Sequence, residues 1–184
     1  AIVFNLYMGS LKPIKNLDKF IPNYVTQFIS SDDVVIKTFG VYKITKVSED
    51  EIPQILKDAI ISIEDKNFYK HEGYDLLALL RSTIVNLKAG SNKQGASTIT
   101  QQLARNLFLS SEKTYVRKIK ELIIAHRIEK TLSKDEILTM YLNNIYLGEG
   151  AYGVAAAADV YFNKKLKDLT IAEAALIAGL PQAP

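Results

Sequence analysis

The residues that decide the fold run from Ile137 to Lys164, with the sequence ILTMYLNNIYLGEGAYGVAAAADVYFNK. The first part of this stretch carries four apolar side chains on one face of a helix, namely Ile137, Leu138, Tyr141 and Leu142. Three glycines then interrupt the helical pattern, namely Gly148, Gly150 and Gly153. An alanine-rich helix follows the glycines. This order of helix, bend and helix indicates a domain built mainly from packed helices.

Helix signals continue on both sides of this stretch. Ser133 is the predicted N-cap of the helix that starts it, and Thr170 with Glu173 predicts the start of a last helix. Ser48 with Glu51, three residues later, forms a predicted capping box near the front of the chain. Four earlier helices are predicted, at 48–63, 74–88, 97–109 and 113–132.

The segment from Lys88 to Gly95 is polar and contains glycine, so it is predicted to be a loop. We expect this loop to be mobile. Ser97 follows it directly and is the predicted N-cap of the helix 97–109.

Strand signals are confined to the front of the chain. Residues 24–29 and 34–39 are rich in β-branched and aromatic side chains, and residues 30–33 between them have the composition of a turn. We therefore expect a mainly α domain with a small β hairpin near its N-terminus.

The composition is that of a packed globular domain, with 184 residues of which 48% are apolar and 23% charged. The absence of cysteine excludes disulfides and thiolate metal sites, and the two histidines, His71 and His126, are too few for a His-rich zinc site. A net charge of +3 is too weak to indicate nucleic acid, and no nucleic-acid partner is expected. Between Glu112 and Lys134, however, seven Lys or Arg residues stand against three acids. Such a run is typical of a solvated helix face and also of a surface that binds anions.

The N-terminal segment from Ala1 to Met8 is mostly apolar. It is too short to span a bilayer, which takes about 20 apolar residues. We interpret residues 1–11 as the membrane-proximal end of a removed anchor and residues 12–184 as one domain.

Glu64 and Asp65 are two acids at the end of an apolar stretch. Such acids often only terminate a helix in water. If Glu64 instead lines a cleft, partial desolvation makes its carboxylate a better base. The aromatic residues and the histidine that follow, between Phe68 and Tyr74, are unusual for a plain surface loop.

Gln102, Arg105 and Asn106 are spaced so that they share one face of the helix 97–109. Such a face can donate hydrogen bonds to sugar and phosphate oxygens. A capped helix with a polar start explains the same residues without any function, so the spacing leaves both interpretations open.

Arg117, Lys118 and Glu121 form the third cluster, with both cations within one helical turn of the carboxylate. A surface ion pair is one interpretation. The other is a diphosphate-binding site, in which the arginine offers a bidentate fork and the lysine a point charge. In that case Glu121 could orient the cations or bind a metal ion.

Taken together, five segments of the chain resemble, in order, the motifs of the peptidoglycan glycosyltransferase family. This family comprises the N-terminal module of class A penicillin-binding proteins and their monofunctional relatives. The segments are EDKNFYKHEG (64–73), QGASTITQQLARNLFL (94–109), RKIKELIIAHRIEK (117–130), the stretch 137–164 and LTIAEAALIAGLPQAP (169–184). Two departures stand out, because Arg105 occupies a position where lysine is common and Asn163 one where glycine is usual.

The resemblance implies a lysozyme-like, two-lobed helical fold and the polymerisation of lipid II, a disaccharide-pentapeptide joined through diphosphate to an undecaprenyl lipid. The implied product is a β-1,4-linked glycan formed with inversion, and undecaprenyl diphosphate is released. The implied catalytic residues are Glu64 as general base and Glu121 as a second acid. The implied substrate contacts are Ser97, Gln102, Arg105, Asn106, Lys113, Arg117 and Lys118.

The resemblance also implies partners and a location. They are lipid II, the lipid-linked glycan chain, a membrane surface and, in the full-length chain, a C-terminal transpeptidase domain. The implied location is the extracytoplasmic (periplasmic) face of the bacterial cytoplasmic membrane. No cofactor is required, and Glu121 is the expected ligand if a divalent cation, Mg²⁺ or Mn²⁺, takes part.

Two alternatives remain at this point. Glu64 would serve equally as the general acid of a lysozyme-like hydrolase that cuts finished glycan. A basic helical module without catalysis would use residues 112–134 to bind nucleic acid in a salt-dependent way. The basic helix argues against the hydrolase, because a hydrolase has no diphosphate to bind.

Overall fold

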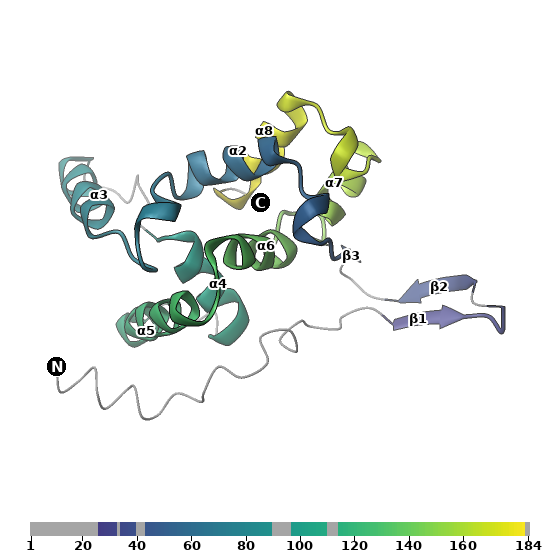
Figure 1. Ribbon diagram of the computed structural model, residues 1–184, viewed down its shortest axis with the longest axis horizontal. Helices are drawn as coiled ribbons and strands as arrows, with labels where there is room; N and C mark the ends of the chain where they lie inside the picture. Colours follow the sequence, from purple (N-terminus) through teal and green to yellow (C-terminus); the bar gives the residue numbers. More distant parts are fainter. Residues whose placement is uncertain (1–25, 33, 40–42, 90–96, 110–113, 183–184) are drawn as a thin grey trace. The chain divides into compact units, whose positions relative to one another are not determined.

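The structure is a computed structural model that describes residues 26–32, 34–39, 43–89, 97–109 and 114–182 (Figure 1). Helices dominate these residues, and strands are few and short. The predicted mainly α class is therefore confirmed. The chain divides into two compact units. The first unit comprises the described residues of 64–138, and the second unit comprises the described residues of 20–63 and 139–184.

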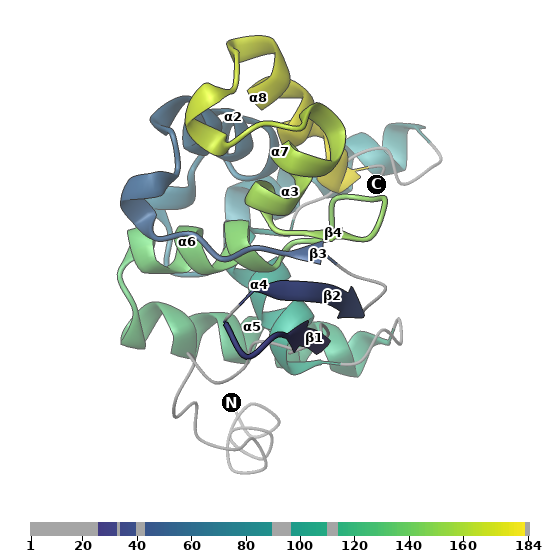
Figure 2. The same cartoon turned by 90° about the vertical axis from the view of Figure 1, so that its right-hand side faces the viewer.

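The first unit is built on two helices that pack against each other, α4 (Ile99–Phe108) and α5 (Tyr115–Thr131). Figures 1 and 2 both show them side by side. Their apolar faces are buried, with Leu103, Ile123 and Ile128 at 0–1% exposure. The short 3₁₀ helix η3 (Phe68–Lys70), the helix α3 (Leu76–Ala89) and the beginning of α6 (Lys134–Asn144) complete this unit.

The second unit contains the predicted hairpin, made of β1 (Thr26–Ile29) and β2 (Val35–Phe39) in antiparallel pairing. In its turn, the Ser30 hydroxyl donates to the Val34 carbonyl at 3.1 Å and also contacts Asp32. A second, parallel pairing joins β3 (Lys43–Ile44) to β4 (Ala151–Tyr152). The other elements of this unit are η2 (Glu49–Glu51), all but the last residue of α2 (Gln54–Glu64), α7 (Val154–Phe162), η4 (Leu166–Asp168), α8 (Ile171–Gly179) and η5 (Leu180–Gln182).

The predicted helix caps at Ser133 and Thr170 are confirmed. The N–H of Ser133 donates to the Glu136 carboxylate at 2.7 Å, and α6 begins at the next residue. Thr170 and Glu173 form a reciprocal capping box at the start of α8. Hydrogen bonds from Lys164 first, and then from the Thr170 backbone, lower the pKa of Glu173 to about 2. The predicted apolar face of α6, which includes Tyr141, is fully buried.

Two predicted helix starts are wrong by a few residues. Ser48 and Glu51 do interact, at 2.8 Å, but they open the short η2 instead of a helix 48–63. Pro53 explains this, because the residue before a proline is driven out of the helical region and Ile52 is extended (φ −90°, ψ 115°). The N-cap of α4 is Thr98, whose side chain accepts from the Gln101 N–H, and not Ser97.

The glycine-rich bend before α7 depends on Gly153, which has φ +84°. A Cβ atom at this position would lie 2.8 Å from the Asn143 carbonyl oxygen, so no larger residue fits without a shift. At the other end of α7, Asn163 adopts the left-handed conformation (φ 50°, ψ 44°). Asparagine is the residue that most often replaces glycine in such a cap. The departure from the family pattern at this position therefore preserves the turn.

Three predictions lie wholly or partly outside the described residues. They concern the N-terminal residues 1–11, Lys113, and the loop 88–95 apart from Lys88 and Ala89, which end α3. Among the helices that the structure describes, none is both long enough and apolar enough to cross a membrane.

Candidate active site

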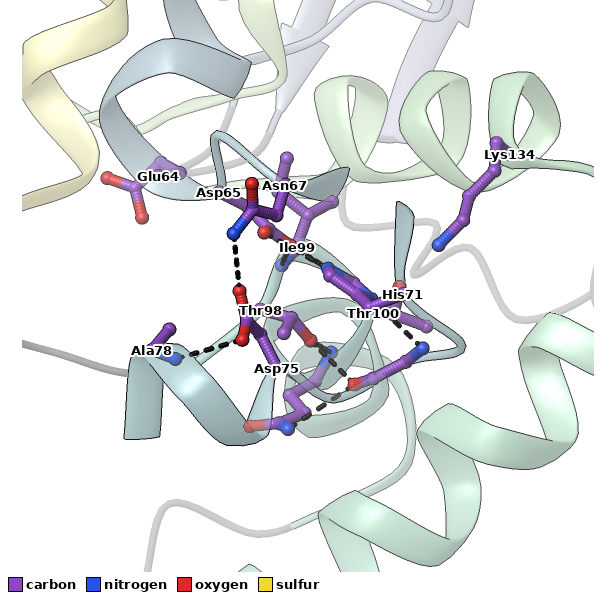
Figure 3. A network of polar contacts seen from close by, with 12 residues as sticks. Glu64, Asp65, Asn67, His71, Asp75, Ala78, Thr98, Ile99, Thr100 and Lys134 are labelled. Atoms are coloured by element: carbon purple, nitrogen blue, oxygen red, sulfur yellow. Dashed lines mark hydrogen bonds and ion pairs between the residues drawn. The ribbon is translucent and has the colours of Figure 1, made fainter. Parts of the chain in front are cut away.

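Glu64 is the last residue of α2 and is half-buried. Its Oε2 atom accepts a hydrogen bond from Gln102 Nε2 at 2.7 Å. Its Oε1 atom is buried and has no hydrogen-bond partner among the described residues. Figure 3 shows the carboxylate of Glu64 pointing away from the polar network that surrounds Asp65. One oxygen is thus anchored, and the other has its lone pairs available.

Asp65, the next residue, points into that network (Figure 3). Its carboxylate contacts His71 Nε2 at 2.8 Å and accepts the backbone N–H of Ile99 at 3.0 Å. His71 Nδ1 accepts the N–H of Gly73 at 3.1 Å, which places a ring proton on Nε2, facing Asp65. Both side chains are less than 10% exposed. Asp65 therefore fixes the chain directly after Glu64 to the first turn of α4.

The carbonyl of Gly73 makes a second connection between the same segments. It accepts from the Thr98 hydroxyl at 2.7 Å and from Gln101 Nε2 at 3.3 Å. Gly73 has φ +90°, and a Cβ atom there would lie 3.2 Å from the backbone of Ala125 on α5. The segment 64–73 and the first turn of α4 are thus held together by several buried hydrogen bonds.

A further buried cluster, centred on Glu129, fixes this part of the unit. Glu129 on α5 accepts from the Thr100 hydroxyl at 2.6 Å and from Lys134 Nζ at 2.8 Å. The Lys134 ammonium also lies 4.5 Å from the ring centroid of Phe68, which is fully buried. These contacts explain why aromatic residues follow Glu64 in the sequence, because Phe68 is a core residue of this unit.

Lys118 on α5 is the centre of the basic cluster. Its Nζ atom donates to Ser97 Oγ at 2.8 Å, to Gln101 Oε1 at 3.2 Å and to Glu121 Oε2 at 2.9 Å. The other oxygen of Glu121 pairs with the Arg117 guanidinium. Glu121 is 1% exposed, so its charge is buried between two cations.

Electrostatics in this cluster favour loss of the lysine proton. Burial lowers the pKa of Lys118 to about 8, and the positive charges of Arg105 and Arg117 act in the same direction. The Glu121 carboxylate opposes this fall. A second anion placed beside Lys118, such as a phosphate, would relieve the same repulsion.

The structure brings together most of the residues singled out from the sequence. Two consecutive glutamines on the first turn of α4 contact the charged groups of the site. Gln101 contacts the Lys118 ammonium, and Gln102 contacts the Glu64 carboxylate. Ser97 contacts Lys118, and Arg105 is close enough to affect its pKa. Asn106 is exposed on α4, and it makes no hydrogen bond or ion pair with the cluster within the part of the chain that the structure describes.

Gln101 is the residue that sequence reasoning missed. Its helical neighbour Arg105, four residues on, was singled out from the sequence, but Gln101 itself was not, and it is 4% exposed. Its three polar contacts reach Gly73, Thr98 and Lys118. The contacts of Gln101 with Gly73 and Lys118 join residues that are far apart in the sequence, and helical spacing does not predict such contacts.

The fit of a divalent cation at Glu121 is poor as the side chains stand. Both oxygens of Glu121 already face cations, at Arg117 and Lys118. Among the described residues, no group of three or more His, Asp or Glu side chains is placed to hold a metal ion.

This arrangement combines a base with cations. Glu64 has a buried oxygen that can accept a proton, and Lys118 with Arg117 can bind an anion near the same helix turn. Such a pairing suits a transfer reaction in which a hydroxyl loses its proton while an anionic group departs.

Comparisons with known proteins identify the family of this chain. Residues 32–184 match the family described as Transglycosylase. Penicillin-binding protein 1A of Neisseria flavescens is 47% identical over the whole chain, and that of Vibrio cholerae is 52% identical over 86% of it. The chain spans 23% and 19% of the length of these two relatives.

Among solved structures, the crystal structure of penicillin-binding protein 1A from Haemophilus influenzae matches with 27% identity and a TM-score of 0.41. This match covers 86% of the present chain and 14% of that chain. The assignment rests on the sequence matches, which extend over nearly all of the chain. The chain belongs to the transglycosylase family and is a glycosyltransferase domain of the kind found in penicillin-binding protein 1A.

Proposed function

We propose that this domain polymerises lipid II into β-1,4-linked glycan with inversion, uses Glu64 as general base and releases undecaprenyl diphosphate. The observation that carries the proposal is that adjacent glutamines of α4 contact the base and the cation, Gln102 on Glu64 and Gln101 on Lys118. The base and the diphosphate-binding group are thereby held by one rigid helix turn.

The first step concerns the incoming sugar. A sugar hydroxyl is a poor nucleophile, so a carboxylate that takes its proton during attack accelerates the reaction, by about 10²–10⁴-fold in typical enzymes. Glu64 Oε1 suits this role, since it is buried and has no partner among the described residues. The hydroxyl oxygen bonds to the anomeric carbon of the donor as its proton passes to Glu64.

The second step concerns the leaving group. As the new bond forms, the bond from the anomeric carbon to the diphosphate oxygen breaks, and the electron pair leaves with the diphosphate. Diphosphate gains negative charge and needs cations more than it needs an acid. Lys118 and Arg117 supply them, and their attraction grows as charge builds, which stabilises the transition state more than the ground state. Attack from the face opposite the diphosphate inverts the anomeric centre.

The lipid tail of such a substrate requires a membrane surface, and we propose that this domain acts at the extracytoplasmic face of the cytoplasmic membrane. In support, α3 exposes several leucines, with Leu76, Leu77 and Leu87 at 61–78% exposure. The helix contains no acidic residue, while the exposed Arg81 adds positive charge that favours anionic lipid headgroups. The much greater length of the relatives supports a further C-terminal domain, which we propose to be a transpeptidase.

The proposed function is tested by incubating the protein with labelled lipid II in detergent and separating the products by size. We expect a ladder of glycan polymers and release of undecaprenyl diphosphate. Release of small sugars from finished glycan, without polymer formation, would instead identify a hydrolase. Inertness toward both substrates, together with salt-dependent binding of nucleic acid, would identify the binding module.

A further inference from the structure

Gln101 has an unusual set of contacts for a residue without an assigned role. It lies in the first turn of α4 and is 4% exposed. Its side-chain Nε2 donates to the Gly73 carbonyl at 3.3 Å, and its Oε1 accepts from Lys118 Nζ at 3.2 Å. Its backbone N–H donates to the Thr98 hydroxyl at 3.2 Å, within the cap of α4.

These contacts fix the orientation of the Gln101 amide. A carbonyl can only accept and an ammonium can only donate, so the nitrogen must face Gly73 and the oxygen must face Lys118. A flipped amide would place donor against donor and acceptor against acceptor. Since Gly73 also receives the Thr98 hydroxyl at 2.7 Å, the amide is anchored to a fixed point of the backbone.

The geometry points to Gln101 as a positioning residue that sets the place and the proton affinity of the Lys118 ammonium, and this inference rests on the proposed function of Lys118 in binding diphosphate. Gln101 acts through Lys118 and does not itself contact the substrate. The same helix turn carries Gln102 on Glu64, so Gln101 keeps the cation in register with the base.

The charged groups around Lys118 make its proton affinity sensitive to each neighbour. Burial disfavours the ammonium most, and Arg105 from α4 and Arg117 from α5 repel it further. Glu121 attracts it at 2.9 Å. The remaining two acceptors are neutral, Ser97 Oγ and Gln101 Oε1. Loss of the Gln101 acceptor therefore favours the neutral amine, whereas a carboxylate in its place favours the cation.

The test measures the titration of Lys118 directly, by NMR of protein labelled with ¹³Cε-lysine, and Lys118→Arg identifies the resonance. In the wild type we expect a pKa for Lys118 of about 8. The nearly isosteric Gln101→Met should move the titration to lower pH, and the isosteric Gln101→Glu should move it up by about one unit or more. The matched control Gln102→Met, whose wild-type side chain contacts Glu64, should leave the titration of Lys118 unchanged.

Titrations that coincide in the wild type and in Gln101→Glu and Gln101→Met would overturn the inference. A purely structural role would lower thermal stability in both variants but would not shift Lys118 in opposite directions. If one of the two variants does not fold, the other alone tests the inference, because the expected shift of the Lys118 pKa has a defined direction in each.

A parallel assay separates this inference from the proposed function. The pH at which kcat/KM for lipid II falls on the alkaline side should follow the same order. It should be lower in Gln101→Met than in the wild type and higher in Gln101→Glu. A wild type that forms no polymer would reject the function, whatever the titration shows. A wild type that polymerises lipid II, with variants that leave Lys118 unmoved, would reject the positioning role alone.

Discussion

Gln102 Nε2 donates a hydrogen bond to Glu64 Oε2 over 2.7 Å, and the other oxygen of Glu64 is left buried without a partner among the described residues. The contact joins Glu64, the last residue of α2, to the first turn of α4, and the two residues are 38 positions apart in the sequence. The hydrogen bond places Gln102 beside the proposed base, whereas the family resemblance implies that Gln102 contacts the substrate. The two roles make different predictions for kinetics.

Replacing Gln102 by leucine should lower kcat by about 10- to 100-fold, because a hydrogen bond to a charged group contributes about 1.5–3 kcal/mol. KM for lipid II should stay near the wild-type value, since the substrate itself loses no contact. Steady-state kinetics with labelled lipid II and a thermal melt of the variant check this. A large rise in KM with kcat retained would return Gln102 to a substrate-binding role.

The activity should fall as pH rises through about 8. Burial, together with Arg105 and Arg117, lowers the pKa of Lys118 to about 8, so the lysine is cationic below this pH and neutral above it. Only the cation can bind diphosphate, and kcat/KM reports the free enzyme. The measurement is a pH profile of kcat/KM for the wild type and for Lys118→Arg, in which the guanidinium stays charged and the alkaline limb should move upward. If kcat/KM falls at the same alkaline pH in both proteins, the titration of Lys118 does not cause the fall.

Replacing Glu121 by glutamine should destabilise the domain, because Glu121 is 1% exposed and balances Arg117 and Lys118. Breaking a fully buried ion pair costs about 3–5 kcal/mol, and the partial exposure of both cations reduces this to about 2 kcal/mol. Urea unfolding measures the loss. Glu72→Gln is the matched control, since its pair with Lys130 is 3.2 Å long and 61–70% exposed, and should cost less than about 1 kcal/mol. Equal losses in both variants would contradict a buried charge cluster.

Asn163 should tolerate glycine but not alanine. Its left-handed conformation (φ 50°, ψ 44°) costs a residue with a Cβ about 1–2 kcal/mol, and asparagine offsets part of this through its short polar side chain. We expect Asn163→Ala to lower the free energy of unfolding by about 1 kcal/mol and Asn163→Gly to leave it nearly unchanged. Denaturant melts of the two variants decide this, and a neutral alanine would show that the cap contributes little.

Local chemistry made much of the fold predictable. The caps at Ser133 and Thr170 depend on interactions within three residues, and both are confirmed. The bend at Gly153 is also confirmed, because glycine is the residue that tolerates its positive φ. The errors arose where two local signals competed. Ser48 has the right partner in Glu51, but Pro53 prevents the helix from continuing. Ser97 and Thr98 are both good N-caps, and only the three-dimensional structure shows that the Ser97 hydroxyl accepts from Lys118 instead.

The candidate site was predictable only in part. Helical spacing placed Arg117 and Lys118 beside Glu121, because these residues interact within one turn. It did not show that Asp65 accepts the N–H of Ile99, 34 residues away, or that Gln101 joins Gly73 to Lys118. These contacts depend on how α4 packs beside the segment 64–73. No pattern of period 3.6 contains that information.

The central claim is that Glu64 removes the proton from the incoming sugar hydroxyl. Glu64→Gln tests it most directly, because an amide keeps the size of the side chain and cannot accept the proton. The measurement is the rate of lipid II polymerisation in detergent, with binding of lipid II as a control for the integrity of the site. We predict loss of the polymer ladder, by about 10²-fold or more, with binding retained. Polymerisation at the wild-type rate by Glu64→Gln would contradict the account.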